Sequence, residues 1–329
     1  MRKFDVYNPY KNMSVTDFYV KIIEEAIQKC GFATKRVSKL KRSADNDAIV
    51  VVHAKDYATA KLCGYKTVLL WVQGITPEES YMRNHSALRR AVLTLKEAPG
   101  IKHSDMILMV SERMKLHFEK KYHINFGDKV FFMPCFNTEL DENSFDTAGK
   151  YTNNVFTYTG AITAWQCFEQ TARMYAYIEK NIPNCMFNVY TPDRDKAEEI
   201  LKEYKIENYS IDFVSVEQLS DELKSVKYGF VLREENEVNY VATPTKLSTY
   251  VSSGVIPIFS SCLDDFAKAT KDMKYVISLK SFNPEELLKN LTDVDVQEQK
   301  EEYRRLFDTY YNRSKYVSNL SEYIINHLS

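Results

Sequence analysis

The chain of 329 residues lacks several features that mark particular classes of protein. No apolar stretch approaches the roughly 20 residues that a membrane-spanning helix needs, and the first residues hold no apolar run like that of a secretory signal. The formal net charge is −1, so no global basic field is present to recruit nucleic acid. We therefore expect a cytoplasmic protein that is soluble or attached to a membrane surface.

Cysteine is also used sparingly, and glycine is scarce. The six cysteines are scattered with no Cys-x-x-Cys pair, and no Cys/His group has the spacing of a zinc site. This pattern predicts reduced, buried thiols and no metal. Against only nine glycines stand 23 tyrosines. Abundant tyrosine suits contacts with sugars or bases, although it more often reflects compositional bias.

Short apolar runs alternate with amphipathic stretches along the first part of the chain. Runs that are apolar at successive positions are typical of strands buried on both faces, so the alternation predicts a parallel α/β sheet. The expected strands are 4–7, 48–53, 67–72, 106–110 and 130–133. The expected helices are 15–29, 80–96 with a stop near Pro99-Gly100, and 111–122 with Ser111 as N-cap.

A second α/β series follows a polar segment, 138–152, that lacks periodicity and is interpreted as an interdomain linker. The expected strands are 155–158, 187–190, 209–214, 228–232 and 255–259, with helices at 165–180, 193–204, 216–225, 298–308 and 314–327. Two doubly wound domains in tandem are therefore predicted. Their bounds are 1–140 and 141–310, and a final helical segment covers 311–329.

The most informative segment runs from 227 to 258 and is predicted to form a strand, a polar loop, a short helix and a second strand. A loop that ends a strand and opens a helix presents free backbone N–H groups and the positive end of the helix dipole, which together favour an anion. Thr243 and Thr245 add hydroxyl donors, and Lys246 adds a charge in the first helical turn. A solvated lysine on an ordinary helix is the alternative interpretation.

This segment resembles the donor site of retaining GT-B glycosyltransferases, and most closely that of the family 4-like enzymes of bacterial polysaccharide assembly. The resemblance rests on Tyr228-Gly229, Leu232-Arg233, Val238-Asn239, Val241-Ala242-Thr243-Pro244-x-Lys246 and Tyr250-x-x-x-Gly254-x-x-Pro257. It implies a GT-B fold, in which two Rossmann-like domains face each other across a cleft and a C-terminal helix packs back on the first domain. It also implies that a sugar moves from a nucleotide-sugar co-substrate to a glycan or lipid-linked acceptor, without a metal or other cofactor.

The resemblance implies two catalytic cations, Arg233 and Lys246. Breaking the bond between sugar and phosphate leaves a nucleoside diphosphate, and cations lower the barrier where that negative charge develops. A Gly160-x-x-x-x-Trp165 segment resembles the part of the family that lies beside the diphosphate. The implied donor-binding residues are Gly160, Trp165, Tyr190, Val214, Thr243, Pro244, Thr245 and Thr249.

The chain departs from the family pattern at four positions of this site. Ala161 and Gln166 stand where many members carry an Arg and a Lys, so the positive charge must come from elsewhere. Val241 and Thr249 stand where the family usually carries a pair of glutamates, the second of which contacts the nucleotide ribose. In the first domain, Gln73 and Gly74 are similar to the cleft-facing loop, and the lone histidines His53 and His85 either face the cleft or are structural.

A short basic stretch contains Lys35, Arg36, Lys39, Lys41 and Arg42. Such a stretch in an otherwise neutral protein suits anionic lipid, and a solvated loop is the alternative. Two other functions remain open. The missing carboxylates favour a GT-B protein that binds a glycan or a partner without catalysis, whereas a sugar-nucleotide epimerase needs cleft carboxylates for proton transfer, and no clear pair is apparent.

Overall fold

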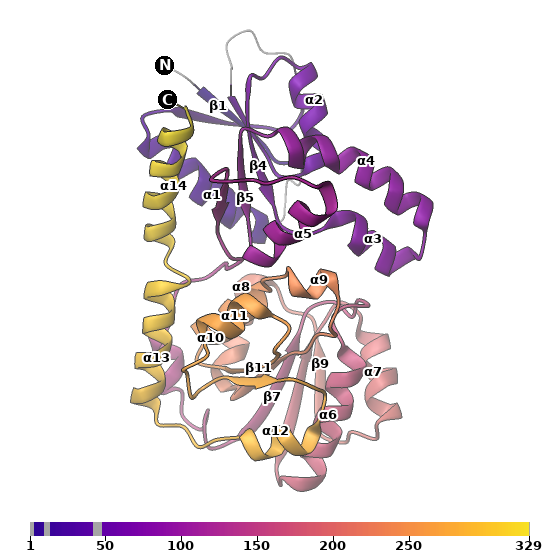
Figure 1. Cartoon of the computed structure of the whole chain (residues 1–329). Coiled ribbons are helices and arrows are strands. Elements are labelled where there is room, and N and C mark those ends of the chain that lie inside the picture. The colour runs from indigo at the N-terminus through magenta and orange to yellow at the C-terminus, as the bar shows by residue number, and fades with distance from the viewer. Residues whose placement is uncertain (1–2, 10–13, 42–47, 329) are drawn as a thin grey trace. The chain divides into compact units, whose positions relative to one another are not determined.

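The computed structural model describes residues 3–9, 14–41 and 48–328. The chain forms two compact units (Figure 1). The first contains the residues up to 137, residues 241–243, and those from 312 onward, and the second contains 138–240 and 244–311. The return of three residues, 241–243, to the first unit is not visible in the sequence pattern, which places this whole stretch in the second domain.

The first unit is built on a parallel sheet with the strand order β2-β1-β3-β4-β5-β6. Its strands are β1 (Lys3–Tyr7), β2 (Ala33–Val37), β3 (Ala48–Val51), β4 (Thr67–Val72), β5 (Met106–Met109) and β6 (Val130–Phe132). Strands β3, β4 and β5 are buried along their whole length, as their unbroken apolar sequences predict. The chain winds in opposite directions from β1, so the sheet has a switch point between β1 and β3.

The helices of this unit are α1 (Ser14–Lys29), η1 (Ala54–Asp56), α2 (Tyr57–Leu62), α3 (Thr76–Asn84), α4 (Ala87–His103), α5 (Glu112–Tyr122) and α14 (Arg313–Leu328). The bounds expected for the helix over 80–96 are wrong at both ends, because the helical stretch begins at Thr76 and ends at His103. It is divided at His85, which has a φ of 49°, and Ser86, whose hydroxyl caps α4. It also continues through Pro99 and Gly100. A Cβ on Gly100 would stand 2.4 Å from the Ala54 carbonyl oxygen, so glycine is required where α4 packs on η1.

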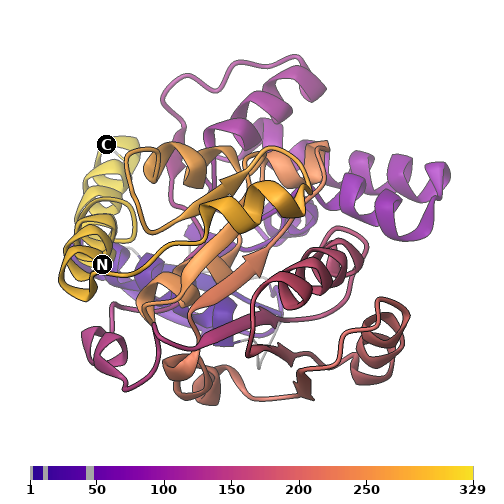
Figure 2. The ribbon, with the colours of Figure 1, turned by 90° about the horizontal axis from the view of Figure 1, so that it is seen from below.

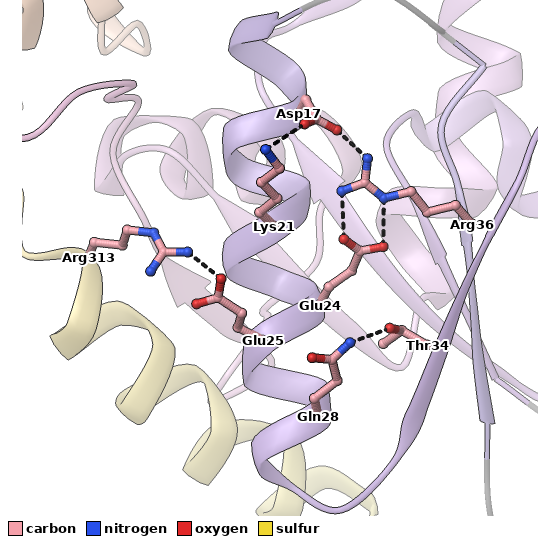
Figure 3. Close-up of polar contacts among 8 residues, drawn as sticks. All are labelled: Asp17, Lys21, Glu24, Glu25, Gln28, Thr34, Arg36 and Arg313. Atoms are coloured by element: carbon pink, nitrogen blue, oxygen red, sulfur yellow. Dashed lines mark hydrogen bonds and ion pairs between the residues drawn. The ribbon is translucent and has the colours of Figure 1, made fainter.

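Strand β2 lies at the edge of the sheet, in the segment that the sequence suggests as a basic loop. Its Arg36 forms two hydrogen bonds of 2.8 and 2.6 Å with the Glu24 carboxylate and a further one with Asp17, both on α1 (Figure 3). On the same helix, Glu25 accepts from Arg313 at the start of α14. The charge of Arg36 is therefore balanced within the protein. Arg42 lies outside the described residues.

The second unit contains a parallel sheet with the order β12-β11-β10-β7-β8-β9. Its strands are β7 (Asn154–Thr159), β8 (Cys185–Tyr190), β9 (Tyr209–Asp212), β10 (Tyr228–Val231), β11 (Ile256–Ser260) and β12 (Ile277–Leu279). The chain runs outward from β7 to β9, returns to β10 beside β7, and then runs outward to β12. The prediction of two doubly wound, Rossmann-like domains is confirmed.

The remaining elements of the second unit are α6 (Phe168–Asn181), α7 (Arg194–Glu203), α8 (Val216–Glu222), η3 (Leu223–Ser225), α9 (Glu237–Tyr240), α10 (Thr245–Ser252), α11 (Asp264–Ala269), α12 (Pro284–Asn290) and α13 (Val296–Thr309). The polar segment expected to be a linker is packed onto this unit through η2 (Glu142–Asp146). Phe145 is buried against the Tyr303 ring, with centroids 5.8 Å apart. Lys300 and Arg304 of α13 also pair with Asp146 and Glu142, each at 2.8 Å. The segment therefore begins at the boundary between the units, as a linker does, but it is packed on the second unit.

Lys150, in the same segment, is a buried lysine whose ammonium donates to the carbonyl oxygens of Leu223 at 2.8 Å and Lys224 at 3.2 Å. Burial lowers its pKa to about 7, and the Asp141 charge opposes the shift. In the unfolded chain the pKa is near 10.5, so above neutral pH the unfolded state binds more protons and folding stability rises with pH.

We predict that Lys150→Met removes this dependence. The unfolding free energy of the wild type relative to the variant should rise by up to about 1.4 kcal/mol per pH unit between about pH 7 and pH 9. Urea unfolding at several pH values measures the difference. Lys202→Met, at an exposed lysine of the same unit, serves as the control. Parallel pH profiles of the wild type and Lys150→Met would contradict the assignment.

Candidate active site

Three residues predicted for donor binding and catalysis meet at the switch point of the second unit. Gly160 directly follows β7, and Arg233 lies two residues after β10, which pairs with β7. Lys246 is the second residue of α10, in the connection from β10 to β11. Ligands of doubly wound sheets bind at the carboxyl ends of the strands where the winding reverses, which is where these three residues lie.

The Lys246 side chain crosses from α10 to the end of β7. Its ammonium donates to Gln166 Oε1 at 2.7 Å and lies 4.5 Å from the centroid of the Tyr158 ring. Gln166 stands at about the place where many members of the family that the segment resembles carry a lysine, and it here accepts from a lysine of another element. Tyr158 attracts a cation through its ring face. Both contacts orient the charge without neutralising it.

Gly160 makes room for this lysine. Its φ is +104°, a backbone conformation that L side chains rarely adopt, and a Cβ there would stand 3.0 Å from Lys246 Cε and 3.2 Å from Nζ. Its N–H donates to the Tyr190 carbonyl oxygen at 2.8 Å, which ties the loop after β7 to the end of β8. Glycine is therefore needed here both for conformation and for the close approach of a charged group.

Arg233 is 5% exposed, and no acidic residue of the described chain forms an ion pair with it, which is rare for a buried arginine. Its guanidinium donates to the carbonyl oxygen of Leu232, and the backbone N–H of Arg233 donates to Ser260 Oγ at 2.8 Å. The same residue lines a cavity of about 210 Å³ whose lining also includes Ser260, Cys262, Lys280 and the exposed carboxylates Glu234 and Glu235. A planar guanidinium at such a place can grip two phosphate oxygens at once.

The electrostatics of this site are unbalanced. Burial lowers the pKa of Lys246 well below its usual range, and the charge of Arg233 lowers it further. Burial also lowers the pKa of Arg233. In the part of the chain that the structure describes, no carboxylate pairs with either residue. Two neighbouring cations removed from water are costly unless an anion joins them, so the site as it stands favours the binding of an anion.

The loop from Gly160 to Gln166 is held by contacts that sequence reasoning did not identify. The Ile162 N–H donates to Asp193 Oδ2 at 2.6 Å, and the Tyr158 hydroxyl donates to the Ala161 carbonyl oxygen at 2.8 Å. Asp193 comes from the connection after β8, far from Ile162 in sequence. Because such pairs are set by the sheet, the sequence offered no signal for them beyond the presence of an aspartate near a helix start.

The other predicted donor-binding residues lie in several different parts of the structure. Thr245 begins α10 and Pro244 is its N-cap residue. Trp165 is partly exposed in the loop before α6, and Val214 is partly exposed just after β9. The Tyr190 ring is buried and its hydroxyl bonds to Glu222. Thr243 belongs to the first unit, where its hydroxyl accepts from the Cys135 N–H at 2.9 Å.

At the two positions where the resembling family usually carries glutamates, the residues of this chain make structural contacts. Val241 is buried in the first unit, and its carbonyl oxygen accepts from the Ser111 hydroxyl at 2.8 Å. The Thr249 hydroxyl donates back to the Thr245 carbonyl oxygen of its own helix at 3.1 Å. Upstream of both positions, Glu234 is exposed and accepts a hydrogen bond from Gln170 Nε2 at 3.2 Å.

A second candidate region is a cavity of about 330 Å³ within the first unit, at the carboxyl ends of β3 and β4. Its lining includes Gln73 and Gly74 as well as His53, Trp71, Glu79 and Glu97. Burial lowers the pKa of His53 to about 4 and raises the pKa values of Glu79 and Glu97. These shifts all favour the neutral forms. His85 lies elsewhere, exposed at the end of α3 with its ring against Tyr81.

Two further features of the described residues bear on chemistry. No group of His, Cys, Asp or Glu within 3–9, 14–41 and 48–328 is arranged to hold a metal ion. All six cysteines are free thiols. None of the helices described is both long and apolar enough to cross a membrane.

The sequence matches no known protein family and no curated protein, but solved structures match the fold. A sucrose-phosphate synthase from Thermosynechococcus elongatus has a TM-score of 0.72 and 9% identity, with 99% of each chain covered. A trehalose-6-phosphate protein from E. coli, bound with UDP-2-fluoro glucose, has a TM-score of 0.66 and 10% identity over 99% of this chain and 98% of that one.

A third structure, TarM from S. aureus in complex with UDP and other ligands, has a TM-score of 0.60 and 10% identity. The match covers 88% of this chain and 56% of TarM, so this chain spans only about half of that protein. Together these likenesses show that the chain has the GT-B fold of glycosyltransferases. The narrower resemblance to family 4-like enzymes stays a prediction.

Proposed function

We propose that this protein is a nucleotide-sugar-dependent glycosyltransferase whose donor diphosphate binds between Gly160, Arg233 and Lys246. One observation carries the proposal: two buried basic side chains meet at the carboxyl ends of β7 and β10, and neither forms an ion pair with a described carboxylate. A diphosphate supplies the missing negative charge. UDP is the nucleotide that we propose first, because two proteins of the same fold are bound to UDP or a UDP sugar.

In the proposed reaction, the bond between the anomeric carbon and the diphosphate oxygen breaks, and its electron pair stays on the diphosphate. Arg233 and Lys246 stabilise that growing charge, as does the amino end of α10. The hydroxyl oxygen of the acceptor bonds to the anomeric carbon, and its proton leaves with the nucleotide or the solvent. Retention of the anomeric configuration rests on the family resemblance alone, and NMR of the product decides it.

For the acceptor we propose an uncharged hydroxyl-bearing group of a glycan or lipid-linked sugar, bound in the cavity beside Gln73 and Gly74. The titratable residues that line it, His53, Glu79 and Glu97, are shifted toward their neutral forms, and the lining includes no lysine or arginine. Such a lining offers hydrogen bonds to hydroxyl groups and little attraction to a phosphate. The expected cytoplasmic location remains a prediction.

A non-catalytic binding protein is the second candidate, and the loss of both family glutamates favours it. Val241 and Thr249 are engaged in packing and in a helix hydrogen bond, so neither substitutes for a carboxylate. Hydrolysis of a UDP sugar in the absence of acceptor separates the two candidates. An enzyme releases UDP slowly in this assay, whereas a binding protein holds the UDP sugar unchanged.

We predict that UDP binding is coupled to uptake of a proton. Lys246 has a strongly lowered pKa in the free protein, and a bound diphosphate raises it again, so the affinity should fall as the pH rises toward about 9. Calorimetry in buffers of different ionisation enthalpy measures the uptake. An affinity that does not depend on pH, with no proton uptake, would contradict the proposed role of Lys246.

A further inference from the structure

The helical hairpin formed by α3 and α4 has an unusual surface. The two helices project from the rest of the first unit in two perpendicular views (Figures 1 and 2). The base of the hairpin is anchored, because Lys121 of α5 pairs with Glu78 at 3.1 Å and with Glu97 at 2.8 Å. Beyond that anchor, residues 87–92 of α4 are all exposed, so its first turns have no core to cover.

The exposed part of α4 carries an apolar stripe. Leu88, Val92 and Leu95 are 77%, 42% and 74% exposed, and their spacing of four and three residues places them on one helix face. Tyr81 of α3, itself 39% exposed, lines a shallow groove of about 510 Å³ with Ala91 and Leu95. Single exposed leucines are ordinary, but a contiguous apolar stripe marks an interaction surface.

The charges around the stripe are all of one sign. Every exposed charged residue between 76 and 103 is basic, namely Arg83, Arg89, Arg90, Lys96 and Lys102, and of these Arg90 is paired with Glu78 at 3.3 Å. The acidic residues of the hairpin lie at its base, where Glu78 and Glu97 are buried and Glu79 is half-buried. An amphipathic helix with an apolar face and basic flanks suits the interface of an anionic bilayer. Two copies of the same basic surface repel each other, which disfavours self-association.

We propose that the α3–α4 hairpin docks this protein on anionic membranes, with Leu88, Val92 and Leu95 inserted among the lipids and the basic side chains at the headgroups. The inference goes beyond the proposed function and does not depend on the donor site. It also places the membrane contact away from the basic stretch near β2, where Arg36 is already paired with Asp17 and Glu24.

Sedimentation with vesicles tests the proposal on the full chain. We expect the wild type to bind phosphatidylglycerol vesicles and to release from them at high salt, with much weaker binding to neutral phosphatidylcholine. A Leu88→Ser, Leu95→Ser double variant should bind at least about tenfold more weakly. The matched control is Leu62→Ser on α2, because Leu62 is 88% exposed but outside the hairpin. It should bind like the wild type.

The charges are tested separately. Arg89→Glu with Lys96→Glu should abolish binding to anionic vesicles, whereas Lys35→Glu with Lys39→Glu should leave most of it. These side chains are exposed, so circular dichroism and UDP binding should be unchanged in every variant. No binding of the wild type to anionic vesicles, or equal loss in Leu62→Ser and the double variant, would overturn the proposal. So would dimers in sedimentation velocity that only the Leu88/Leu95 variant abolishes.

Discussion

Replacing Lys246 by methionine should lower the turnover of a UDP sugar by about 100- to 1,000-fold, because one preorganised donor to a developing charge is lost. The same substitution should leave the melting temperature unchanged or raise it. Lys246 is buried beside Arg233 and its pKa is held low, so folding either buries its charge or removes its proton, and methionine avoids both costs. A residue kept only for structure would show the opposite change in stability.

A matched control is available in the same unit. Lys227 is also buried, lies over the ring of Tyr228 at 5.2 Å, and has a pKa lowered by burial. It precedes β10 and therefore stands at the opposite edge of the sheet from Arg233. Lys227→Met should retain UDP binding and turnover, as measured by calorimetry and by UDP release. Full activity of Lys246→Met would show that the donor site lies elsewhere.

Arg233→Met should also reduce turnover, as Lys246→Met does. The combined variant should lose less than the product of the two single losses, because both cations act on one diphosphate. A fully multiplicative loss would instead indicate two independent sites. The comparison requires only steady-state rates of the two single variants and the double variant.

Gly160→Ala should weaken UDP binding by about tenfold or more and lower turnover with it. A side chain at a φ of +104° strains the loop by about 1–3 kcal/mol, and its Cβ would stand 3.0 Å from Lys246 Cε, so the lysine must move. Since the ammonium has to meet a phosphate oxygen at hydrogen-bonding distance, a small displacement has a large effect on the transition state. Calorimetry with UDP and steady-state kinetics measure both changes.

Gly254→Ala separates this effect from simple destabilisation. Gly254 also has a positive φ, +71°, and a Cβ there would stand 2.7 Å from the Tyr151 hydroxyl. This control should lose at least as much stability as Gly160→Ala, yet UDP should bind the folded protein with its normal affinity. If both variants lose stability and affinity in the same proportion, the special role of Gly160 is refuted.

Much of the fold could be read from the order of residues. Strands such as 67–72 are apolar at successive positions, and the Ser111 N-cap has a local signature in sequence. The edge strand β2 was not predicted, because it carries polar and basic residues where a central strand would be apolar. The break at His85 was also missed, since helical periodicity continues across it and only the backbone turns.

The candidate site, too, was indicated in part by the sequence and in part only by the tertiary structure. The positions of Gly160 after a strand and of Lys246 at a helix start indicated ligand contacts, because a parallel sheet presents them there, and the family resemblance added Arg233. The tertiary structure decided which of them meet. It pairs Lys246 with Gln166, 80 residues earlier in the chain, and it assigns Thr243 to the first unit.

Local chemistry thus determined the two parallel sheets, their alternation with helices, and the residue types available at the strand ends. Burial and charge balance depend on groups brought together by the winding of the sheet, so only the tertiary structure could show them. Arg36 and Arg233 illustrate the difference. Both are arginines in or just after a strand, but the structure surrounds the first with carboxylates and leaves the second buried beside another cation.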